Sequence, residues 1–474
     1  MRHYLVGFAL VALAAPAAAA DKPIIAPSPA WVRAIVLPPT PKTDEAAIRL
    51  MLQDEQVLFE PGRRTVYSRT AIQLQTPQGL AAGNISLPWR PDVDVLSVHA
   101  VLIHRGDKVI DVLASGQTFT VVRREANLEN ASLDGVLTAN IQPEGLEVGD
   151  ILDVAISLSS SDPVLKGHGE QMAGAWNVLP IARARLRMQW PASMPIRVRS
   201  ADAAAALKTV TRDGVSSVEL ASDGTIPIMP PKGAPMRYQI GRLVEASDFA
   251  SWSQLAALMA PLYAKAAVLP SVGPLQGEVA RIKALSADPA VRAEAALALV
   301  QDRVRYAFRG MDGGNYVPAD AEVTWSKRFG DCKGKTALLL GLLNALGIEA
   351  EAVLVNTAGG GDGLDAHLPM ATWFNHVLVR ATIAGRTYWM DGTRTGDKTL
   401  DRLRTPPFGW GLPLAAANST LVRMVPVALD EPDEVLSIRI DATGGLTVPA
   451  PTKIERLTRG DGSLAMNAWL SNVR

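Results

Sequence analysis

The sequence predicts an α+β protein, with an N-terminal antiparallel β-sandwich, an α+β core and a short C-terminal β extension. Three observations predict this order. Apolar and polar residues alternate through residues 44–245, with Gly, Pro and Asp between the runs, as is typical of short antiparallel strands. Apolar residues then recur at helical spacing from 249 to 347. Strand-like alternation returns after residue 347 and again after residue 430.

Residues 1–20 have the features of a secretory signal peptide. "MRHY" is basic, "LVGFALVALAA" is an apolar run too short to span a bilayer, and "AAA" before Asp21 is a small-residue cleavage pattern. We therefore expect export to a periplasmic or extracellular space. No later apolar run reaches the roughly 18 residues that a spanning helix needs, so no transmembrane segment is expected in the mature chain.

A proline-rich segment, 21–43, leads into the β-rich region 44–245. "QVLFEPGRRTVYSRTAIQLQTPQGL" alternates around a Pro-Gly turn, and "VDVLSVHAVLIHRGDKVIDVL" repeats the pattern around Arg105-Gly106-Asp107. Further short strands follow, and no internal repeat of fixed period is present. The region is predicted to be a β-sandwich domain without a catalytic motif of its own.

Helical patterns begin at residue 249 and open a second predicted domain, 249–425. In "DPAVRAEAALALVQDRVRYAFRG", Asp288 is the expected N-cap and Pro289 the first helical residue. A leucine-rich helix is predicted from Cys332 to Leu346, ended by Gly347. The strand "EAEAVLVN", the flexible loop "TAGGGDGLDAHLP" and the hairpin "FNHVLVRATI–AGR–TYWMDGT" follow. Residues 430–474 begin another hairpin, either an abbreviated extension or an incomplete third domain.

Charge and cysteine usage exclude several classes of function. The 47 Lys and Arg residues balance 47 Asp and Glu residues, so no basic field favours nucleic acid or an anionic membrane. Cys332 is the only cysteine, which excludes an internal disulfide. A lone thiol is either a small buried hydrophobe or a reactive group.

The position of Cys332 at the first turn of a helix favours reactivity. Unpaired backbone N–H groups there stabilise a thiolate and can donate to an oxyanion. Asp331 opposes a second negative charge, so a cationic partner is required, and histidine is the usual one. His376, at a strand start, is the candidate. The other histidines are not expected to act on the thiol. His3 lies in the signal peptide, and His99, His104 and His168 lie in the β-rich region, where sheet or turn roles are expected. His367 is expected to be solvated in the glycine-rich loop.

The hairpin gives a geometric test of this hypothesis. If Ala384-Gly385 is a two-residue loop, Ile383 pairs with Arg386. His376 and Asp391 then lie on one face of the hairpin as diagonal neighbours. A one-residue slip would place them on opposite faces. The predicted register therefore permits Asp391 to orient the imidazole of His376.

The motifs "RFGDCKGKTALLLGLLNALGIEAEAVLV", "FNHVLVRA" and "TYWMDGT" together resemble the transglutaminase-like superfamily over Phe249–Thr393. The bacterial secreted type, in which a β-rich domain of unknown function precedes the core, is the most similar. The resemblance implies a papain-like cysteine-enzyme core with Cys332 as nucleophile, His376 as base and Asp391 as orienting acid. This is the Cys-His-Asp arrangement of thiol acyl-transfer enzymes.

Four further residues relate to these motifs. Gly334 stands where bulkier or acidic residues are common in the family, and Gly392 where proline is usual. Trp325 and Asn375 flank the motifs; they either line an acyl site and support the oxyanion or have packing and strand-edge roles. One cysteine and the absence of an H-E-x-x-H motif predict no metal site, and no cofactor is expected.

The expected function is acyl transfer or hydrolysis at amide bonds of cell-envelope proteins or peptides, through a thioester on Cys332. The sequence does not decide between an amine and water as the acceptor, and it specifies neither the natural substrate nor the oligomeric state. A catalytically inactive envelope-binding or scaffold protein with the same fold is the alternative. In a third hypothesis Cys332 only fills the core beside the leucines.

Overall fold

The computed structural model describes residues 21–40, 45–123, 136–174, 176, 179–200, 207–239, 241–307, 315–415, 418–428, 431–445 and 447–472. The predicted signal peptide, 1–20, lies outside the described residues. Strands make up 36% of the structure and helices 23%, so the protein is dominated by β structure, although α+β broadly fits. No helix among the described residues is long and apolar enough to cross a membrane.

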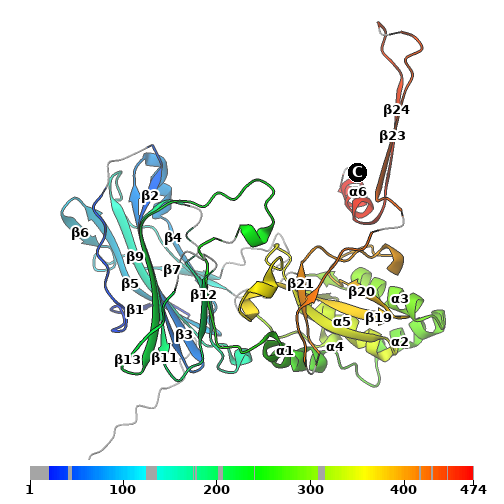
Figure 1. The fold of residues 1–474 in the computed structure, drawn as a ribbon, viewed down its shortest axis with the longest axis horizontal. Helices are drawn as coiled ribbons and strands as arrows, with labels where there is room; N and C mark the ends of the chain where they lie inside the picture. Colours follow the sequence, from blue (N-terminus) through cyan, green and yellow to red (C-terminus); the bar gives the residue numbers. More distant parts are fainter. Residues whose placement is uncertain are drawn as a thin grey trace, which may run out of the picture.

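The N-terminal half is built on one large twisted sheet (Figure 1). Within the described residues it has nine strands in the order β1-β5-β9-β3-β2-β11-β14-β13, with β6 paired to β5. The strands are β1 (Ile24–Ile25), β2 (Ile48–Glu60), β3 (Arg63–Leu74), β5 (Asp94–Arg105), β6 (Lys108–Asp111), β9 (Ile151–Ser160), β11 (Ile181–Pro191), β13 (Val210–Arg212) and β14 (Val215–Thr225).

This sheet is mixed, and the prediction of an antiparallel sandwich is wrong. β2 pairs with β11 in parallel, as β1 does with β5, while the hairpin of β2 and β3 is antiparallel. Alternation along a single strand predicts which face is buried. It contains no information on the direction of a partner that lies far away in the sequence. For this reason the hairpins were predictable and the parallel pairings were not.

Two small sheets pack against the large one instead of forming a single facing layer. β4 (Ile85–Trp89), β8 (Leu137–Ile141) and β7 (Thr120–Arg123) form one, and their apolar residues cluster with those of β5 and β9. β10 (Glu170–Ala173), β15 (Val244–Ser247) and β12 (Arg197–Ser200) form the other, which clusters with β2, β11 and β14. The second small sheet also faces the C-terminal half of the chain.

The C-terminal half packs helices against an antiparallel sheet. In the described residues this sheet has the order β20-β19-β18-β21-β22. Its strands are β18 (Glu349–Val355), β19 (His376–Ile383), β20 (Arg386–Met390), β21 (Trp410–Pro413) and β22 (Val422–Arg423). The helices are α1 (Trp252–Ala266), α2 (Pro274–Leu285), α3 (Pro289–Arg303), α4 (Ala321–Lys327) and α5 (Cys332–Ala345); β16 (Arg305–Tyr306) and β17 (Phe329–Gly330) pair in parallel.

Helix α5 is the centre of this half. All its residues are buried except the last two, because α1, α3, α4, β18 and β19 all contact it. Its leucines Leu339, Leu342 and Leu343 are fully buried. Gly347 follows the helix at φ 76°, the left-handed conformation expected at a C-terminal cap. Asp288 caps α3 as predicted, with its side chain accepting a hydrogen bond from the Ala290 amide.

The C-terminal segment is not a β extension alone. β23 (Glu434–Ile440) and β24 (Thr452–Thr458) form a hairpin that projects away from the body, and α6 (Gly460–Asn472) follows it (Figure 1). Almost every residue of the hairpin is exposed, including Ile438 and Ile454. The prediction lacked the helix. The domain divisions near residues 245–249 and 425–430 stay predictions.

Candidate active site

Cys332 is the first residue of α5, and Asp331 is its N-cap. The Asp331 carboxylate accepts a hydrogen bond from the Gly334 amide at 2.9 Å and forms an ion pair with Lys333 at 2.5 Å. Lys333 is 1% exposed. Both contacts compensate the negative charge of Asp331. From the sequence alone, this charge was expected to disfavour a thiolate at Cys332. The first turn of the helix therefore keeps its electropositive character at the thiol.

Glycine at position 334 has a steric reason. A Cβ at this position would lie 2.7 Å from the Thr324 side-chain oxygen, Oγ1. Thr324 is on α4 and is 1% exposed, so it has little room to move. Glycine in the first turns of a helix costs about 1 kcal/mol relative to alanine. The absence of a side chain at this position permits α4 to pack closely against α5, the helix that positions Cys332.

The hairpin of β19 and β20 has the predicted register. Ala384 and Gly385 both have positive φ, 50° and 77°, as a two-residue type I′ turn requires. Ile383 pairs with Arg386, and the ladder continues to Val379 opposite Met390. His376, at the start of β19, and Asp391, just after β20, consequently lie on the same face. The Nε2 atom of His376 is 2.9 Å from Oδ2 of Asp391.

Asp391 is held in place by several hydrogen bonds. Its Oδ1 accepts from the Thr393 amide at 2.8 Å and from the Thr393 hydroxyl at 2.7 Å. Its backbone carbonyl accepts from Gln301 Nε2 on α3 at 2.9 Å. Burial raises the pKa of this carboxyl, but the bonds from His376 and Thr393 outweigh burial and lower it. Asp391 is therefore a buried carboxylate that stays ionised.

His376 links the carboxylate to the thiol. Burial alone would lower the pKa of the imidazole, but hydrogen bonds with Asp391 and with Cys332 raise it to about 10. Because Nε2 faces Asp391, the Nδ1 atom is the ring nitrogen left for Cys332. The structure thus brings together the three residues that the sequence selected, Cys332, His376 and Asp391. Their side chains come from α5, from β19 and from the end of β20.

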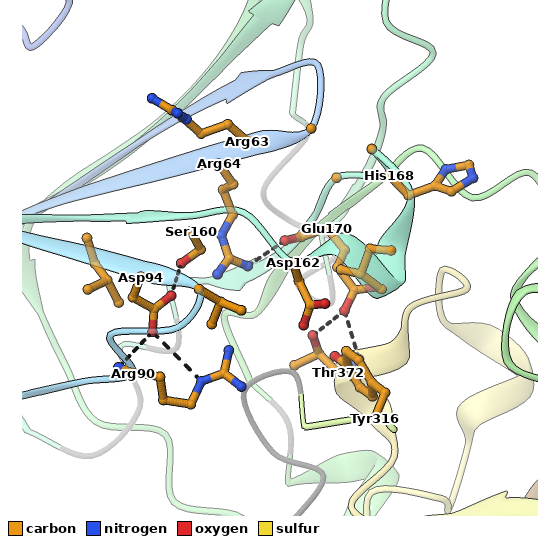
Figure 2. A pocket seen from close by; sticks show the side chains of 16 residues that line it. Arg63, Arg64, Arg90, Asp94, Ser160, Asp162, His168, Glu170, Tyr316 and Thr372 are labelled. Atoms are coloured by element: carbon orange, nitrogen blue, oxygen red, sulfur yellow. Dashed lines mark hydrogen bonds and ion pairs between the residues drawn. The ribbon is translucent and has the colours of Figure 1, made fainter. Parts of the chain in front are cut away.

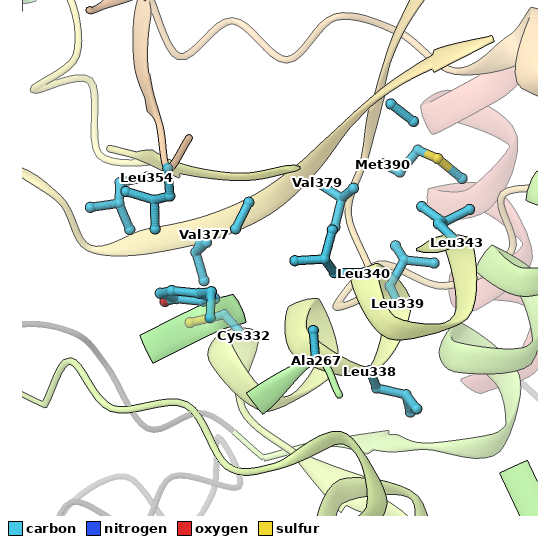
Figure 3. Close-up of a cluster of buried hydrophobic side chains, with 14 of the residues drawn as sticks. Ala267, Cys332, Leu338, Leu339, Leu340, Leu343, Leu354, Val377, Val379 and Met390 are labelled. Atoms are coloured by element: carbon cyan, nitrogen blue, oxygen red, sulfur yellow. The ribbon is translucent and has the colours of Figure 1, made fainter. Parts of the chain in front are cut away.

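The thiol is completely enclosed. Cys332 is 0% exposed and belongs to the main apolar cluster of the C-terminal half. Figure 3 shows it beside Val377 of β19, at the end of the leucine-rich helix. This burial is what the core-filler hypothesis expects. The core-filler hypothesis does not explain why a buried imidazole, itself bound to a carboxylate, interacts with the thiol. A small hydrophobe has no need of an ionisable partner.

The two secondary candidates differ in position. Trp325, on α4, is 3% exposed, and its indole Nε1 is buried without a hydrogen-bond partner among the described residues. The Arg328 guanidinium lies 3.5 Å from the centre of a Trp325 ring. Asn375 instead binds the chain after β18, since its Oδ1 accepts from the Thr357 amide at 2.9 Å. Among the described residues no hydrogen bond joins Asn375 to the thiol, and its bond to Thr357 fits the strand-edge role.

Sequence reasoning missed two groups near the site. Tyr263 of α1 is 1% exposed, and its hydroxyl has no partner in the described part of the chain. Burial, followed by electrostatic interactions with Cys332 and Asp331, raises its pKa well above 10, so it is a neutral phenol. No periodic pattern identifies it. Thr393 was identifiable, because "DGT" is a turn sequence in which a carboxylate binds the chain two residues on.

The segment before His376 is anchored by the N-terminal half. Glu170 of β10 accepts from the amides of Ala371 and Thr372 at 2.7 and 2.9 Å. Glu245 of β15 accepts from the Leu368 amide at 2.8 Å and binds His367. Glu170 is 3% exposed and Glu245 is 0% exposed. Two buried carboxylates of the second small sheet therefore fix the approach to the candidate base.

The glycine-rich loop is packed into this junction, contrary to the expectation of a flexible loop with a solvated histidine. A Cβ at Gly361 would lie 2.0 Å from the Phe408 carbonyl oxygen, so the loop needs glycine for close backbone approach. The His367 side chain is only 7% exposed. No group of three His, Cys, Asp or Glu residues that could hold a metal ion is present among the described residues.

One family model matches part of the chain. Residues 60–222 match a family model described as a domain of unknown function with solved structure (DUF3857). This match covers about a third of the chain and includes none of the three candidate residues. No curated protein matches the sequence.

Among solved structures, a proposed protease from Parabacteroides distasonis is similar with a TM-score of 0.62 and 15% identity, over 80% of this chain and 72% of that one. At this identity the likeness shows a shared fold alone. M1 zinc metallopeptidase structures from Deinococcus radiodurans match 42% of each chain at 12% identity and a TM-score of 0.24, which is too low to support an argument.

Proposed function

We propose that this protein is a thiol enzyme that acts on amide bonds of proteins or peptides through Cys332, His376 and Asp391. One observation carries the proposal: Nε2 of the His376 imidazole lies 2.9 Å from Oδ2 of Asp391, and against the effect of burial the neighbouring Asp391 and Cys332 raise the pKa of His376 to about 10. A protonated imidazole beside a thiol favours the thiolate, which is the nucleophilic form. The fold that the chain shares with a proposed protease supports the same class of reaction.

The proposed reaction has two steps. The Cys332 thiolate attacks the amide carbonyl, the C–N bond breaks as the C–S bond of a thioester forms, and imidazolium His376 gives its proton to the departing amine. Water or a second amine then attacks the thioester. His376 takes the proton of this nucleophile and returns it to the sulfur as the C–S bond breaks. Water gives hydrolysis and an amine gives acyl transfer.

Two kinds of donor are candidates to stabilise the charge that develops on the carbonyl oxygen. The N-terminal amides of α5 and the buried Nε1 of Trp325 are donors, and Nε1 has no competing partner in the described residues. We propose that Trp325 supports the oxyanion and that Asn375 only holds the strand edge. The buried carboxylate of Asp391 keeps the imidazole oriented throughout both steps.

A cell-envelope binding or scaffold protein without turnover is the second candidate function. The observation in its favour is the complete enclosure of Cys332, because a substrate carbonyl reaches Sγ only after the surrounding chain moves. In this case the fold and the buried polar contacts serve stability. The two candidates differ in whether any amide chemistry depends on Cys332.

The test is an assay of the purified protein on a denatured protein substrate, with and without a primary amine such as a dansylated alkylamine. The proposal predicts peptide-bond cleavage, glutamine deamidation or amine incorporation with wild type. It predicts a loss of this product of at least about 100-fold in Cys332→Ala and in His376→Gln. Mass spectrometry of the substrate distinguishes the three products. Equal product from wild type and Cys332→Ala would leave only the binding function.

A further inference from the structure

A cavity of ≈ 180 Å³ lies between the two halves of the protein, away from the thiol. Its walls come from the start of β3, the ends of β9 and β10, and Tyr316 and Thr372 of the C-terminal half (Figure 2). Pockets for drug-sized ligands are typically about 300–1,000 Å³. The volume therefore suits a small metabolite rather than a peptide. Neither half of the chain forms the cavity alone.

Two guanidinium groups face each other across this cavity. Arg64 donates through Nη1 to the Glu170 carbonyl at 2.7 Å, but its buried Nε has no partner among the described residues. Arg90 lies opposite, with its Nε 3.8 Å from Oδ2 of Asp94 and its side chain 17% exposed. Figure 2 shows both side chains pointing into the same space. A planar carboxylate between two such groups receives several charge-assisted hydrogen bonds.

An unpaired acceptor completes the cavity. Oδ1 of Asp162 accepts from the Val164 amide at 2.9 Å, while its buried Oδ2 has no partner in the described chain. Burial raises the pKa of Asp162, because nothing nearby fully compensates a negative charge there. Two other polar groups of the lining are engaged: Glu170 binds Thr372, and Asp94 accepts from the Ser160 hydroxyl at 2.7 Å. The open positions are thus cationic donors on one side and one carboxylate oxygen on the other.

We propose that this cavity binds a free amino acid, with its carboxylate between Arg64 and Arg90 and its ammonium group on Oδ2 of Asp162. Nε of Arg64 and Oδ2 of Asp162, both buried and unpaired in the described chain, then have hydrogen-bond partners. Each new bond removes the penalty of about 1–3 kcal/mol for leaving a buried polar group unsatisfied. A phosphate would be repelled by Asp162, and a simple carboxylate would leave Asp162 unpaired. An amine alone would leave the guanidinium groups without an anion. The site is independent of the thiol chemistry and goes beyond the proposed function.

The experiment is isothermal titration calorimetry of the full chain carrying Cys332→Ala, so that no turnover contributes heat. The probes are each standard amino acid, acetate, methylammonium chloride and inorganic phosphate. We expect saturable binding of at least one amino acid with one site per chain. Acetate, methylammonium and phosphate should bind at least about tenfold more weakly, because each makes only part of the contacts.

Variants locate the binding in the cavity. Arg90→Gln and Asp162→Asn should each weaken amino-acid binding by at least about tenfold. Asparagine is also a good N-cap, so Asp162→Asn keeps the bond to Val164 that begins the next turn. Arg212→Gln is the matched control: Arg212 is exposed on β13 and is not among the residues that line the cavity, so binding should not change.

Three results would overturn the proposal. They are no saturable heat with any amino acid, binding that neither Arg90→Gln nor Asp162→Asn changes, and acetate or phosphate binding as tightly as the best amino acid. The first result means that water fills the cavity. The third means that it is an anion site. Because all titrations use Cys332→Ala, they neither support nor weaken the proposed amide chemistry.

Discussion

His376 and Asp391 lie on adjacent strands with Nε2 and Oδ2 2.9 Å apart, and a two-residue turn at Ala384-Gly385 fixes that relationship. Adding or removing one residue in this turn would move the carboxylate to the other face of the sheet. The electrostatics of the site follow from the pair. The carboxylate raises the pKa of a buried imidazole, and Cys332 adds to this shift.

Replacing Asp391 tests directly whether its carboxylate orients His376. Asp391→Asn keeps the side-chain shape and removes the charge that raises the pKa of His376. We expect turnover on amide substrates to fall by at least about 100-fold with the fold intact, since the imidazole loses its charge and its fixed orientation. The matched control is Asp223→Asn, which removes an exposed partner of Arg183. A loss of less than about twofold in Asp391→Asn would contradict the assigned orientation.

The raised pKa of His376 predicts a pH dependence of stability. In Cys332→Ala, which has no thiol titration, His376 keeps its hydrogen bond with Asp391, and we predict that this bond alone still raises its folded pKa. A raised folded pKa contributes stability that is complete below pH 6.5 and is lost as the pH rises toward the folded value, at most about 10. Urea unfolding of Cys332→Ala should show this alkaline loss, and Cys332→Ala/His376→Gln should not. Equal slopes for both proteins would refute the raised pKa.

Glycine at position 334 is predicted to matter for packing. Gly334→Ala should destabilise the protein although alanine favours helix by about 1 kcal/mol, because the new Cβ meets Thr324 Oγ1 at 2.7 Å. Gly277→Ala on α2 is the control. Its Cβ meets nothing within 4 Å, so this change should stabilise by up to about 1 kcal/mol. Chemical denaturation measures both, and a stability gain in Gly334→Ala would disprove the close approach of α4 and α5.

The junction contact of Glu170 is predicted to be worth more than a surface ion pair. Glu170→Gln places an amide donor against the N–H groups of Ala371 and Thr372 and should lower the free energy of unfolding by about 1–3 kcal/mol. The control Glu219→Gln removes an exposed partner of Arg33 and should change it by less than about 1 kcal/mol. Equal effects of the two changes in denaturant unfolding would show that Glu170 does not anchor this segment.

Local signals predicted most of the candidate site. Asp331, Cys332 and Gly347 set the limits of α5, and a turn of two residues set the register that joins His376 to Asp391. Long-range features were not predictable. The parallel pairing of β2 with β11 and the anchoring of Ala371 by Glu170 depend on residues far apart in the chain. The enclosure of Cys332 depends on how several elements pack, which periodicity does not describe.

The glycine-rich loop is a further segment whose packing could not be predicted from local sequence. Composition predicts flexibility for a run such as "GGGDG", because glycine has no conformational preference of its own. In the fold, Gly361 is needed for the opposite reason, as the backbone of Phe408 occupies the space of a side chain. Only the tertiary structure distinguishes a glycine that permits motion from one that permits contact.

Alkylation of Cys332 by iodoacetamide at pH 6, followed by intact-protein mass spectrometry, tests the central claim most directly. With one cysteine in the chain, every thiol adduct reports on this residue. A thiolate bound to protonated His376 should react at least about tenfold faster in wild type than in His376→Gln, because a neutral thiol is a poor nucleophile at this pH. Equal rates for the two proteins would contradict the thiolate–imidazolium pair.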